Sequence, residues 1–528
     1  MAKGSESKPL DLIVSNGILV IPGVGQIKAD VGISGGEIAV IGENLKDAGA
    51  ETYDAAGRMV LPGIFDPHIH IGNEQSYESE AETETRAAIL GGVTSVGIFL
   101  RSLEDSYFDH LPAFRKAMDE RSYVDSVFHP QIFTEKQIDE IPGYAEQFGI
   151  RSFKFYMSGM PGIVKSVTDD VLLHGFRTVA SLGPDAIACV HCETGALVDA
   201  ARNDLKIRKP EGTLKDWEEA HPAIAEALAI QTALYLAKIA GAHLYVVHLS
   251  SQQGLEVVRA ARRAGLHFTV ETTTPYLGIN SLDPNGFLVK MVPPVRTPEH
   301  QTALWQGFLE GSINTVGTDN TSRARATKKP EAGLHGSRPG LPALGTHLPA
   351  LLHYGRLRGV PLEVLVERAT RSPARVYGIY PQKGTIAVGS DADLVVVDLE
   401  LEKVVRAADL QGMSDFSPFE GKMLKGWPVA TIKAGKIIAR DGKIVGKANG
   451  RYLRASRRRP SNSSGSEARS RDGGRRRVLS GDQQCIRAAA GAAHCRRKSS
   501  LCRRARSARL PASQCPFCSA RMANRPRT

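Results

Sequence analysis

The hydrophobic pattern near the two ends of the chain differs from the pattern in its middle. Near both ends, short segments alternate apolar and polar residues around Gly and Asn turns, as in DLIVSNGILVI and GTIAVGSDADLVVVDLE. Alternation with a period of two, interrupted by turn residues, is typical of β-hairpins. We therefore expect residues 1–62 and 383–455 to build one β-sandwich domain from both chain ends.

Residues 63–382 instead alternate short apolar runs with longer helical patterns such as AIAEALAIQTALYLAKIAGA. The runs that resemble buried strands are Phe65–Ile71, Thr94–Leu100, Val124–Pro130, Arg151–Met157, Ile187–Glu193, His243–Ser250, His267–Thr274 and Asn314–Asn320. Strands that alternate with helices in this way predict an α/β fold, a (β/α)8 TIM barrel.

Polar residues interrupt these runs near their C-terminal ends, the face where such barrels place their active sites. The residues are His68, His70, Lys154, His191, His248 and Asp319. His68 and His70 stand two positions apart, so both side chains point to one face of their strand. A single histidine is more often a core residue than a ligand. Several at neighbouring strand ends, with a carboxylate, predict a site for a divalent metal such as zinc.

Lys154 is the unusual member of this set, because a protonated amine is repelled by nearby cations. A buried lysine tends to lose its proton, and a neutral amine can add carbon dioxide to become an anionic carbamate. Such an N6-carboxylysine would bridge two metals. The spacing alone leaves open a second reading, in which the lysine reaches the barrel rim or pairs with an acid.

Residues 456–528 differ from the rest in composition and charge. They carry 18 Arg and 1 Lys against three acidic residues, a local charge of +16, which leaves −5 for residues 1–455 out of a total of +11. Few large apolar residues and no periodic pattern predict a disordered basic tail. Nucleic acid is therefore not expected to bind the folded body, and only the tail offers charge for an acidic partner.

Cysteines and apolar runs bear on the compartment. Residues 1–455 contain only Cys189 and Cys192, so no disulfide framework is expected and a reducing compartment fits. In the tail, Cys515-Pro-Phe-Cys518 has no second pair at zinc spacing, and we favour an appended segment with no part in the chemistry. The pattern predicts neither a membrane span nor a secretory signal. We expect a cytoplasmic protein.

An ordered set of motifs resembles one branch of a known family. The motifs are Asp66-Pro-His-Ile-His70, SFKFYMSG, VVHLSS, GTDN, Ser372-Pro-Ala-Arg-Val-Tyr-Gly378 and Gly389-Ser-Asp-Ala-Asp-Leu394. Together they resemble the dihydropyrimidinase and hydantoinase branch of the amidohydrolase superfamily, over about residues 10–455. The resemblance implies two divalent metals, expected to be zinc. It assigns His68, His70 and Asp319 to one metal, His191 and His248 to the other, and carboxylated Lys154 to the bridge.

The resemblance also implies a reaction. A hydroxide held between two cations is a strong nucleophile at neutral pH, because the cations lower the pKa of bound water. Asp319 would act as general base and then general acid while the C–N amide bond of a cyclic amide, ureide or imide breaks. The expected partner is thus a small amide substrate. Similar enzymes are homo-oligomers, so a tetramer or dimer is expected.

Three residues near the expected substrate depart from the pattern of similar hydantoinases. Gly159 stands where those proteins have an oxyanion-donating tyrosine, and Tyr156 is the nearest replacement. Val292 replaces a serine before a Pro-Pro pair, and Asn320 stands where histidine is common. We expect these residues to contact the substrate and to select a ring other than plain dihydrouracil.

Other functions share some of these features. Dihydroorotases place an arginine two residues after the second histidine to hold a carboxylate, and Gly72 argues against an acidic substrate held in that manner. An amidohydrolase for a non-cyclic or otherwise atypical amide would keep the same ligands. A non-catalytic scaffold relative would have lost some of them, whereas this chain keeps all. A binder of nucleic acid or membrane surfaces would act through residues 456–528.

Overall fold

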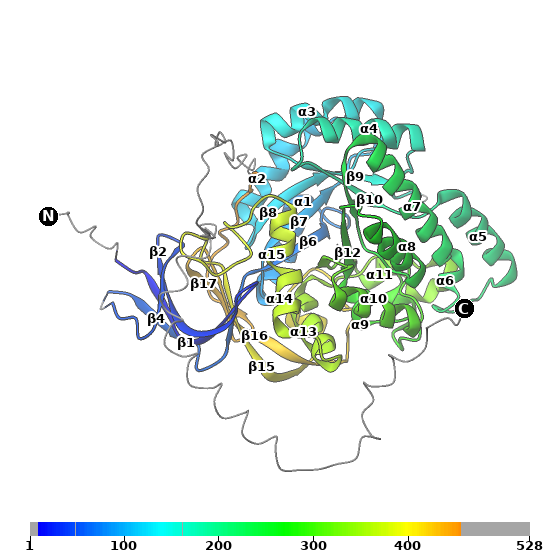
Figure 1. Cartoon of the computed structure of the whole chain (residues 1–528). Coiled ribbons are helices and arrows are strands. Elements are labelled where there is room, and N and C mark those ends of the chain that lie inside the picture. Colours follow the sequence, from blue (N-terminus) through cyan, green and yellow to red (C-terminus); the bar gives the residue numbers. More distant parts are fainter. Residues whose placement is uncertain (1–8, 48, 161, 456–528) are drawn as a thin grey trace, which may run out of the picture. The chain divides into compact units, whose positions relative to one another are not determined.

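The computed structural model describes residues 9–47, 49–160 and 162–455. The predicted disordered tail, with its Cys515–Cys518 motif, lies outside the described residues. Within them, the chain forms a barrel of parallel strands and a large sheet to which both chain ends contribute (Figure 1).

The barrel strands follow one another in chain order. They are β6 (Ile64–His70), β7 (Val93–Leu100), β8 (Asp125–Pro130), β9 (Ser152–Tyr156), β10 (Ile187–His191), β11 (His243–Val246), β12 (Thr269–Thr273) and β13 (Thr315–Gly317), with the short β14 (Asn320–Thr321) paired to β6. Hydrogen bonds join β6 to β8 in one sheet and β9 to β13 in another. A bridge between Gln131 and Lys154 connects β8 to β9. Thr318 N–H donates to Asp66 Oδ1 at 3.1 Å and links the end of β13 to β6, so the barrel is closed.

Helices follow the strands and cover the barrel (Figure 1). Up to β13 they are α1 (Tyr77–Leu90), η1 (Tyr107–Asp109), α2 (Leu111–Arg121), α3 (Glu135–Phe148), α4 (Asp169–Ser181), α5 (Gly195–Arg208), α6 (Trp217–Ala220), α7 (Ala223–Ala240), α8 (Gln252–Arg263), α9 (Thr274–Gly278), η2 (Gly286–Val289) and α10 (Pro298–Glu310). After β14 come α11 (Arg325–Lys328), η3 (Pro330–Ala332), α12 (Gly333–Gly336), η4 (Leu344–Thr346), α13 (His347–Leu357), α14 (Leu362–Ala369), α15 (Arg371–Val376) and α16 (Ala407–Leu410).

Local signals explain the ends of several helices, of which α3 is an example. The Oγ1 of Thr134 accepts the N–H of Gln137 at 3.2 Å and caps the first turn. Gly149 follows the last turn with a φ of +70°, a conformation that glycine adopts without strain.

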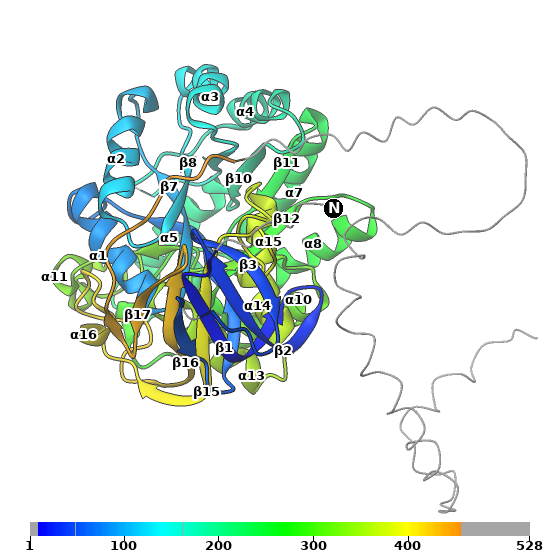
Figure 2. The same ribbon diagram turned by 90° about the vertical axis from the view of Figure 1, so that its left-hand side faces the viewer.

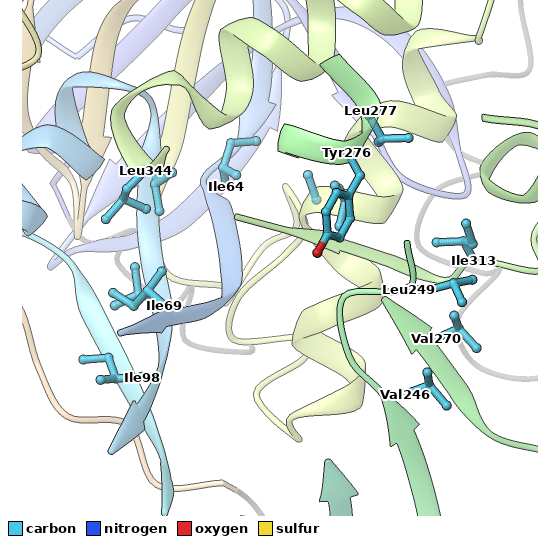
Figure 3. Packing of buried hydrophobic residues seen from close by; sticks show 14 of the residues in the cluster. Ile64, Ile69, Ile98, Val246, Leu249, Val270, Tyr276, Leu277, Ile313 and Leu344 are labelled. Atoms are coloured by element: carbon cyan, nitrogen blue, oxygen red, sulfur yellow. The ribbon is translucent and has the colours of Figure 1, made fainter. Parts of the chain in front are cut away.

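Apolar side chains fill the layer between the strands and the helices. Figure 3 shows part of this core, in which Ile69, Ile98, Val246 and Val270 come from four different barrel strands and are all buried. Strands of a closed parallel barrel are covered on both faces, so their sequences are almost continuously apolar. Polar residues in such strands therefore stand out in the sequence.

Both ends of the chain contribute to one hydrogen-bonded sheet. Its strands are β1 (Leu12–Ile21), β2 (Gly25–Ser34), β3 (Glu37–Gly42), β4 (Glu51–Asp54), β5 (Met59–Pro62), β15 (Leu394–Val404), β16 (Met423–Lys433), β17 (Lys436–Arg440) and β18 (Lys443–Ile444). The antiparallel pair β5–β15 joins the two ends, with Val60 opposite Val396. Figure 2 shows the blue N-terminal strands beside the yellow and orange C-terminal ones. The predicted β-rich unit from both ends is present as this sheet, and its description as a sandwich stays a prediction.

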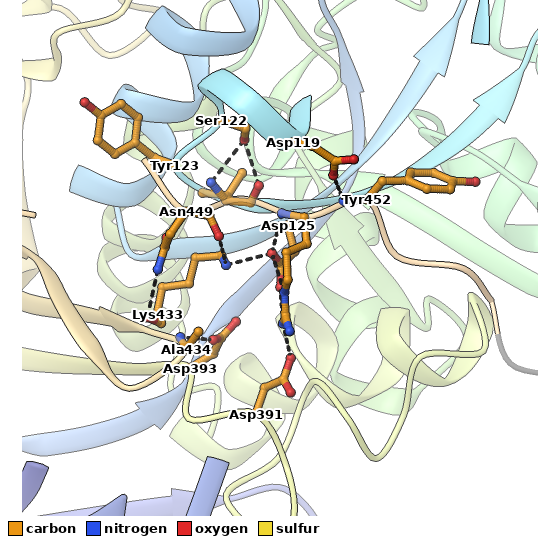
Figure 4. A network of polar contacts seen from close by, with 12 residues as sticks. Asp119, Ser122, Tyr123, Asp125, Asp391, Asp393, Lys433, Ala434, Asn449 and Tyr452 are labelled. Carbon is orange, nitrogen blue, oxygen red and sulfur yellow. Dashed lines mark hydrogen bonds and ion pairs between the residues drawn. The ribbon is translucent and has the colours of Figure 1, made fainter. Parts of the chain in front are cut away.

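A buried ionic cluster joins this sheet to the barrel (Figure 4). Asp125 of β8 is fully buried and lies 2.7 Å from Lys433 Nζ and 2.5 Å from Lys383 Nζ. Lys383 also pairs with Asp391 and Asp393, at 2.8 and 2.6 Å. Several opposite charges are needed here because a single buried carboxylate without partners is strongly unfavourable.

One helical stretch among the described residues, Trp217–Ala240, is long and apolar enough to cross a membrane by length and composition alone. Only 44% of its apolar window is buried inside the protein. Ala229, Ile230 and Ala233 of α7 belong to the core of the barrel, which accounts for part of its apolar character. A single stretch of this kind is weak evidence for a membrane span.

Candidate active site

A cavity opens at the C-terminal ends of the barrel strands. It measures about 630 Å³ including its mouth. Its lining includes the six residues predicted as metal ligands, which are His68, His70, Lys154, His191, His248 and Asp319. Tyr156 and Val292, two of the predicted substrate residues, also line it. The structure thus brings together side chains from strands that are far apart in sequence.

His68 and His70 form a tight cluster with Asp319, which follows β13. One nitrogen or oxygen atom from each of the three lies within 4.8 Å of the other two. Asp319 Oδ1 is 3.2 Å from His68 Nε2 and 3.1 Å from His70 Nε2. The two histidines alternate with Ile69 on β6 and therefore face the same side, toward the end of β13.

Glu271 of β12 lies behind His68. Its Oε1 is 2.7 Å from His68 Nδ1, and its Oε2 accepts the hydroxyl of Tyr245 at 2.6 Å. Burial lowers the pKa of His68 well below its ordinary value, so the ring is neutral. With Nδ1–H donating to Glu271, the lone pair of Nε2 is directed to the cavity. A carboxylate on the second nitrogen is the usual way in which a protein orients a metal-binding histidine.

His191 and His248 form a second group. His191 Nδ1 is 3.0 Å from His248 Nε2, while His191 Nε2 is 2.9 Å from Glu193 Oε2. Two nitrogens bound to one zinc, each about 2.0–2.1 Å from it, stand about 3.3 Å apart in a tetrahedral site. Glu193 is in turn 2.8 Å from His221 Nδ1, so a buried network fixes the orientation of the His191 ring.

The backbone is left-handed at two of these residues. His248 has a φ of +40° and Asp319 a φ of +53°. Non-glycine residues in this region cost about 1–3 kcal/mol each and are concentrated at functional sites. Burial disfavours the charge of Asp319, but His68, His70 and Lys154 outweigh it and lower the pKa of this carboxyl. Asp319 is therefore ionised at neutral pH.

Lys154 is fully buried, and its Nζ has no hydrogen-bond partner among the described residues. The amine lies 5.0 Å from the ring centre of Phe99 and 5.1 Å from that of Tyr156. Burial lowers the pKa of Lys154 to about 8, although the negative charge of Asp319 opposes this shift. A substantial fraction of the amine is therefore neutral near pH 8, the state that reacts with carbon dioxide.

The donor atoms of the cavity suit divalent metals. His68 Nε2 and Lys154 Nζ are buried without hydrogen-bond partners in the described part of the chain. Buried polar atoms are normally satisfied, so such atoms call for an explanation. Imidazole nitrogens and a carboxylate oxygen at these spacings match the ligand preferences of zinc.

Asn320, predicted as a substrate contact, lies outside the lining of this cavity. Its side chain is fully buried and donates from Nδ2 to Glu84 Oε2 at 3.2 Å. Its Oδ1 accepts the backbone N–H of Leu344 at 3.1 Å. The left-handed backbone at Asp319 and these two hydrogen bonds direct the Asn320 side chain away from the cavity.

Gly159 is also outside the lining of the cavity. It lies in the loop after β9, and its carbonyl oxygen accepts Nη1–H of Arg202 at 3.2 Å. The same loop contributes Met160, Ile163 and Val164 to the lining instead. The substrate contact of Gly159 itself stays a prediction.

Tyr156 remains available to a substrate. Its ring stacks on His191 with 5.5 Å between the ring centres. Burial and the charge of Asp319 raise the pKa of the Tyr156 phenol, so it stays protonated and can donate a hydrogen bond. Val292 is apolar and lines the cavity near Met291.

Several residues around the site were not predicted. Asp66 accepts the N–H and the hydroxyl of Thr318, at 3.1 and 2.6 Å, and thereby holds the segment that carries Asp319. Glu193 and Glu271 orient histidines. All three acids stand in or directly after apolar strands, and that signal could have identified them. Arg101 and Arg323, which also line the cavity, follow the strands in segments without a clear pattern.

Comparisons with known proteins agree with this geometry. Residues 59–438 match the model of the Amidohydrolase family. An L-hydantoinase of Paenarthrobacter aurescens is 31% identical over 82% of this chain and 96% of its own length. An allantoinase of Rubrobacter xylanophilus is 33% identical over 85% of this chain and 98% of its own length.

A solved structure of a D-hydantoinase shows the same architecture. It superposes with a TM-score of 0.79 at 30% sequence identity, covering 84% of this chain and 98% of that protein. The predicted resemblance to hydantoinases is thereby confirmed. On the family match and these relatives together, the chain belongs to the amidohydrolase family.

Proposed function

We propose that this protein is a metal-dependent hydrolase that opens a cyclic amide, ureide or imide at its C–N amide bond. Relatives named hydantoinase and allantoinase, matched over nearly their whole length, support a reaction of this type. One observation carries the proposal. Six potential ligands line one cavity, and His68 Nε2 and Lys154 Nζ are buried there without hydrogen-bond partners among the described residues.

Two divalent ions, which we propose to be zinc, would be held by these side chains. His68, His70 and Asp319 would bind one ion, as their mutual distances of at most 4.8 Å allow. His191 and His248 would bind the other. Lys154, as N6-carboxylysine, would supply the anionic oxygens that both ions share, and its neutral amine is the form that carbon dioxide modifies.

The metals, when bound, activate water and polarise the substrate carbonyl. Asp319 takes the proton of the attacking water at its carboxylate and delivers it to the leaving ring nitrogen, acting first as base and then as acid. The water oxygen bonds to the carbonyl carbon, and the C–N bond breaks. The product is an open-chain acid that keeps the nitrogen as a carbamoyl, amide or amine group.

Other side chains of the cavity support this step. Glu271 fixes the tautomer of His68 and directs its Nε2 inward through the 2.7 Å contact at Nδ1. Tyr156, whose phenol stays protonated, is the candidate donor to the developing oxyanion in place of the tyrosine of similar hydantoinases. Val292 contributes apolar surface to the substrate side of the cavity.

The wider organisation follows from the same features. We propose a TIM-barrel hydrolase domain at 63–382, a β-sandwich domain formed by 1–62 and 383–455, and a basic segment at 456–528 without a catalytic role. A homo-oligomer of two or four copies is supported by exposed apolar residues on α7, among them Tyr235 and Ile239. Two free, buried cysteines, Cys189 and Cys192, suit a reducing, cytoplasmic setting.

A hydrolysis screen tests the proposal. The protein, loaded with zinc in the presence of bicarbonate, is incubated with hydantoins, dihydropyrimidines, cyclic imides, lactams and open-chain amides. We expect at least one ring class to gain one water, detected by mass spectrometry, and metal-stripped protein to be inactive until zinc is restored. Turnover that is independent of metal, or turnover of open-chain amides alone, would contradict the proposal.

A further inference from the structure

Two arginines line the cavity together with the proposed ligands. Arg101 follows β7 and Arg323 follows β14. Arg101 is exposed, and no other described residue forms a hydrogen bond or ion pair with its guanidinium. Arg323 is buried, with Nε–H donating to the carbonyl of Pro339 at 2.8 Å, a contact that uses only part of its donor capacity.

Nearby acids do not neutralise this pair. Glu74 Oε2 is 3.7 Å from Arg323 Nη1, too long for a hydrogen bond. Glu80 is occupied by backbone N–H groups of the loop after β6, including those of Gly72 at 2.6 Å and Gln75 at 2.7 Å. Glu74 and Glu80 both place negative charge near Arg323, whereas Arg101 has no ion pair among the described residues.

Arg101 and Arg323 line the same cavity. Burial lowers the pKa of the Arg323 guanidinium, Glu74 and Glu80 oppose this shift, and the positive charges of Arg338 and Arg101 add to it. Like charges held together in a partly buried place are unfavourable. An anion bound between Arg101 and Arg323 would relieve that repulsion.

The remaining lining defines what else the ligand must offer. Met160, Ile163, Val164, Met291 and Val292 give the cavity an apolar side, and Asp319 with the histidines gives it the reactive end. A suitable ligand therefore combines a hydrolysable ring amide, some apolar surface and one anionic group. The planar fork of a guanidinium matches the two oxygens of a carboxylate.

We propose that the substrate of this enzyme carries a carboxylate substituent on its amide ring, and that Arg101 and Arg323 bind this carboxylate. The inference rests on the proposed function, because it names the substrate class of the same cavity. The absence of an arginine at Gly72 argued only against the dihydroorotase manner of holding an acid. Here the positive charge comes instead from the segments after β7 and β14.

A matched pair of substrates tests this proposal. Hydantoin-5-acetate and hydantoin-5-acetamide have nearly the same shape and differ in charge. A charge-assisted hydrogen bond is worth about 1.5–3 kcal/mol, so we expect kcat/KM to favour the acid by about 10- to 100-fold. Arg101→Gln should reduce this ratio at least about tenfold, mainly through KM. Arg325→Gln, which removes the same charge from an exposed position outside the cavity lining, should leave the ratio unchanged.

A binding measurement separates this proposal from the proposed function. Calorimetric titration of the zinc-loaded protein with each compound reports recognition without turnover. If neither ring opens but the acid binds more tightly and Arg101→Gln removes the difference, the reaction is wrong and the anion site stands. Equal affinity for acid and amide in the wild type would overturn the anion site, whatever the turnover. So would a preference for the acid that survives in both Arg101→Gln and Arg323→Gln.

Discussion

The cavity has two regions that are built in different ways. The ligand floor consists of His68, His70, Lys154, His191, His248 and Asp319. These residues lie on barrel strands or directly after them, and carboxylates such as Glu271 and Glu193 orient the histidines. The substrate wall consists of Arg101 and of residues from the loops at 157–164, 286–293 and 321–341.

The substrate wall is held largely by main-chain contacts. Lys328 Nζ donates to the carbonyls of Lys290 and Gly340, at 2.6 and 2.7 Å, and Lys290 Nζ donates to that of Ser337 at 2.7 Å. Main-chain carbonyls are present whatever the side chains are, so such contacts leave no pattern in the sequence. In the proposed function, residues at the strand ends carry the reaction, whereas residues of the loops select the ring.

The largest expected effect concerns the proton-transfer residue of the ligand floor. Asp319→Asn removes the proposed base, and general acid–base catalysis contributes about 10²- to 10⁴-fold. We therefore expect kcat on the preferred ring to fall by about that factor, while thermal unfolding remains cooperative. Steady-state kinetics of the zinc-loaded variant measure this. Activity within about tenfold of the wild type would show that another group moves the proton.

A smaller effect is expected at Glu271, which contacts the ligand-floor residue His68 on the ring nitrogen that faces away from the cavity. Glu271→Gln keeps the shape of the side chain but weakens its hold on His68 Nδ1, and such changes typically cost about 10- to 100-fold in metal affinity or activity. Competition with a zinc chelator gives the affinity. Tyr245→Phe, which removes one hydrogen bond from Glu271 and keeps its charge, serves as a graded control and should lose less. An equal loss in both variants would point to a general packing defect.

The smallest expected effect is that of a substitution at Asn320, which follows Asp319 but lies outside the lining of the cavity. Asn320→Ala removes one of the hydrogen bonds to Glu84 and leaves the N–H of Leu344 without its acceptor, so we expect a loss of about 1–3 kcal/mol in unfolding free energy. The relative kcat/KM values for different rings should stay the same. Val292→Ala, which alters the lining itself, should shift those relative values. An altered ring preference in Asn320→Ala would show that Asn320 affects substrate selection, as a substrate contact would.

The contrast between the ligand floor and the substrate wall explains how much of the site could be predicted from the sequence. Lys154 and His191 stand out because they interrupt apolar strands. The C-terminal ends of all strands in a parallel barrel lie on the same face, so residues there can be placed from the sequence. The buried position of the Asn320 side chain could not be predicted, because the left-handed backbone at Asp319 and the buried partner Glu84 are tertiary features. In the sequence, Arg101 and Arg323 resemble ordinary surface arginines. Only the folded barrel brings them to the same cavity.

The central claim is that the ligand floor holds two metals bridged by a carboxylated Lys154. The most direct measurement combines metal analysis with ¹³C NMR after the protein is loaded with zinc and ¹³C-bicarbonate. For the wild type we predict about two metals per chain and a carbamate signal, and for Lys154→Ala the loss of that signal, of bound metal and of activity. A Lys154→Ala protein that keeps both metals and full activity would contradict the account.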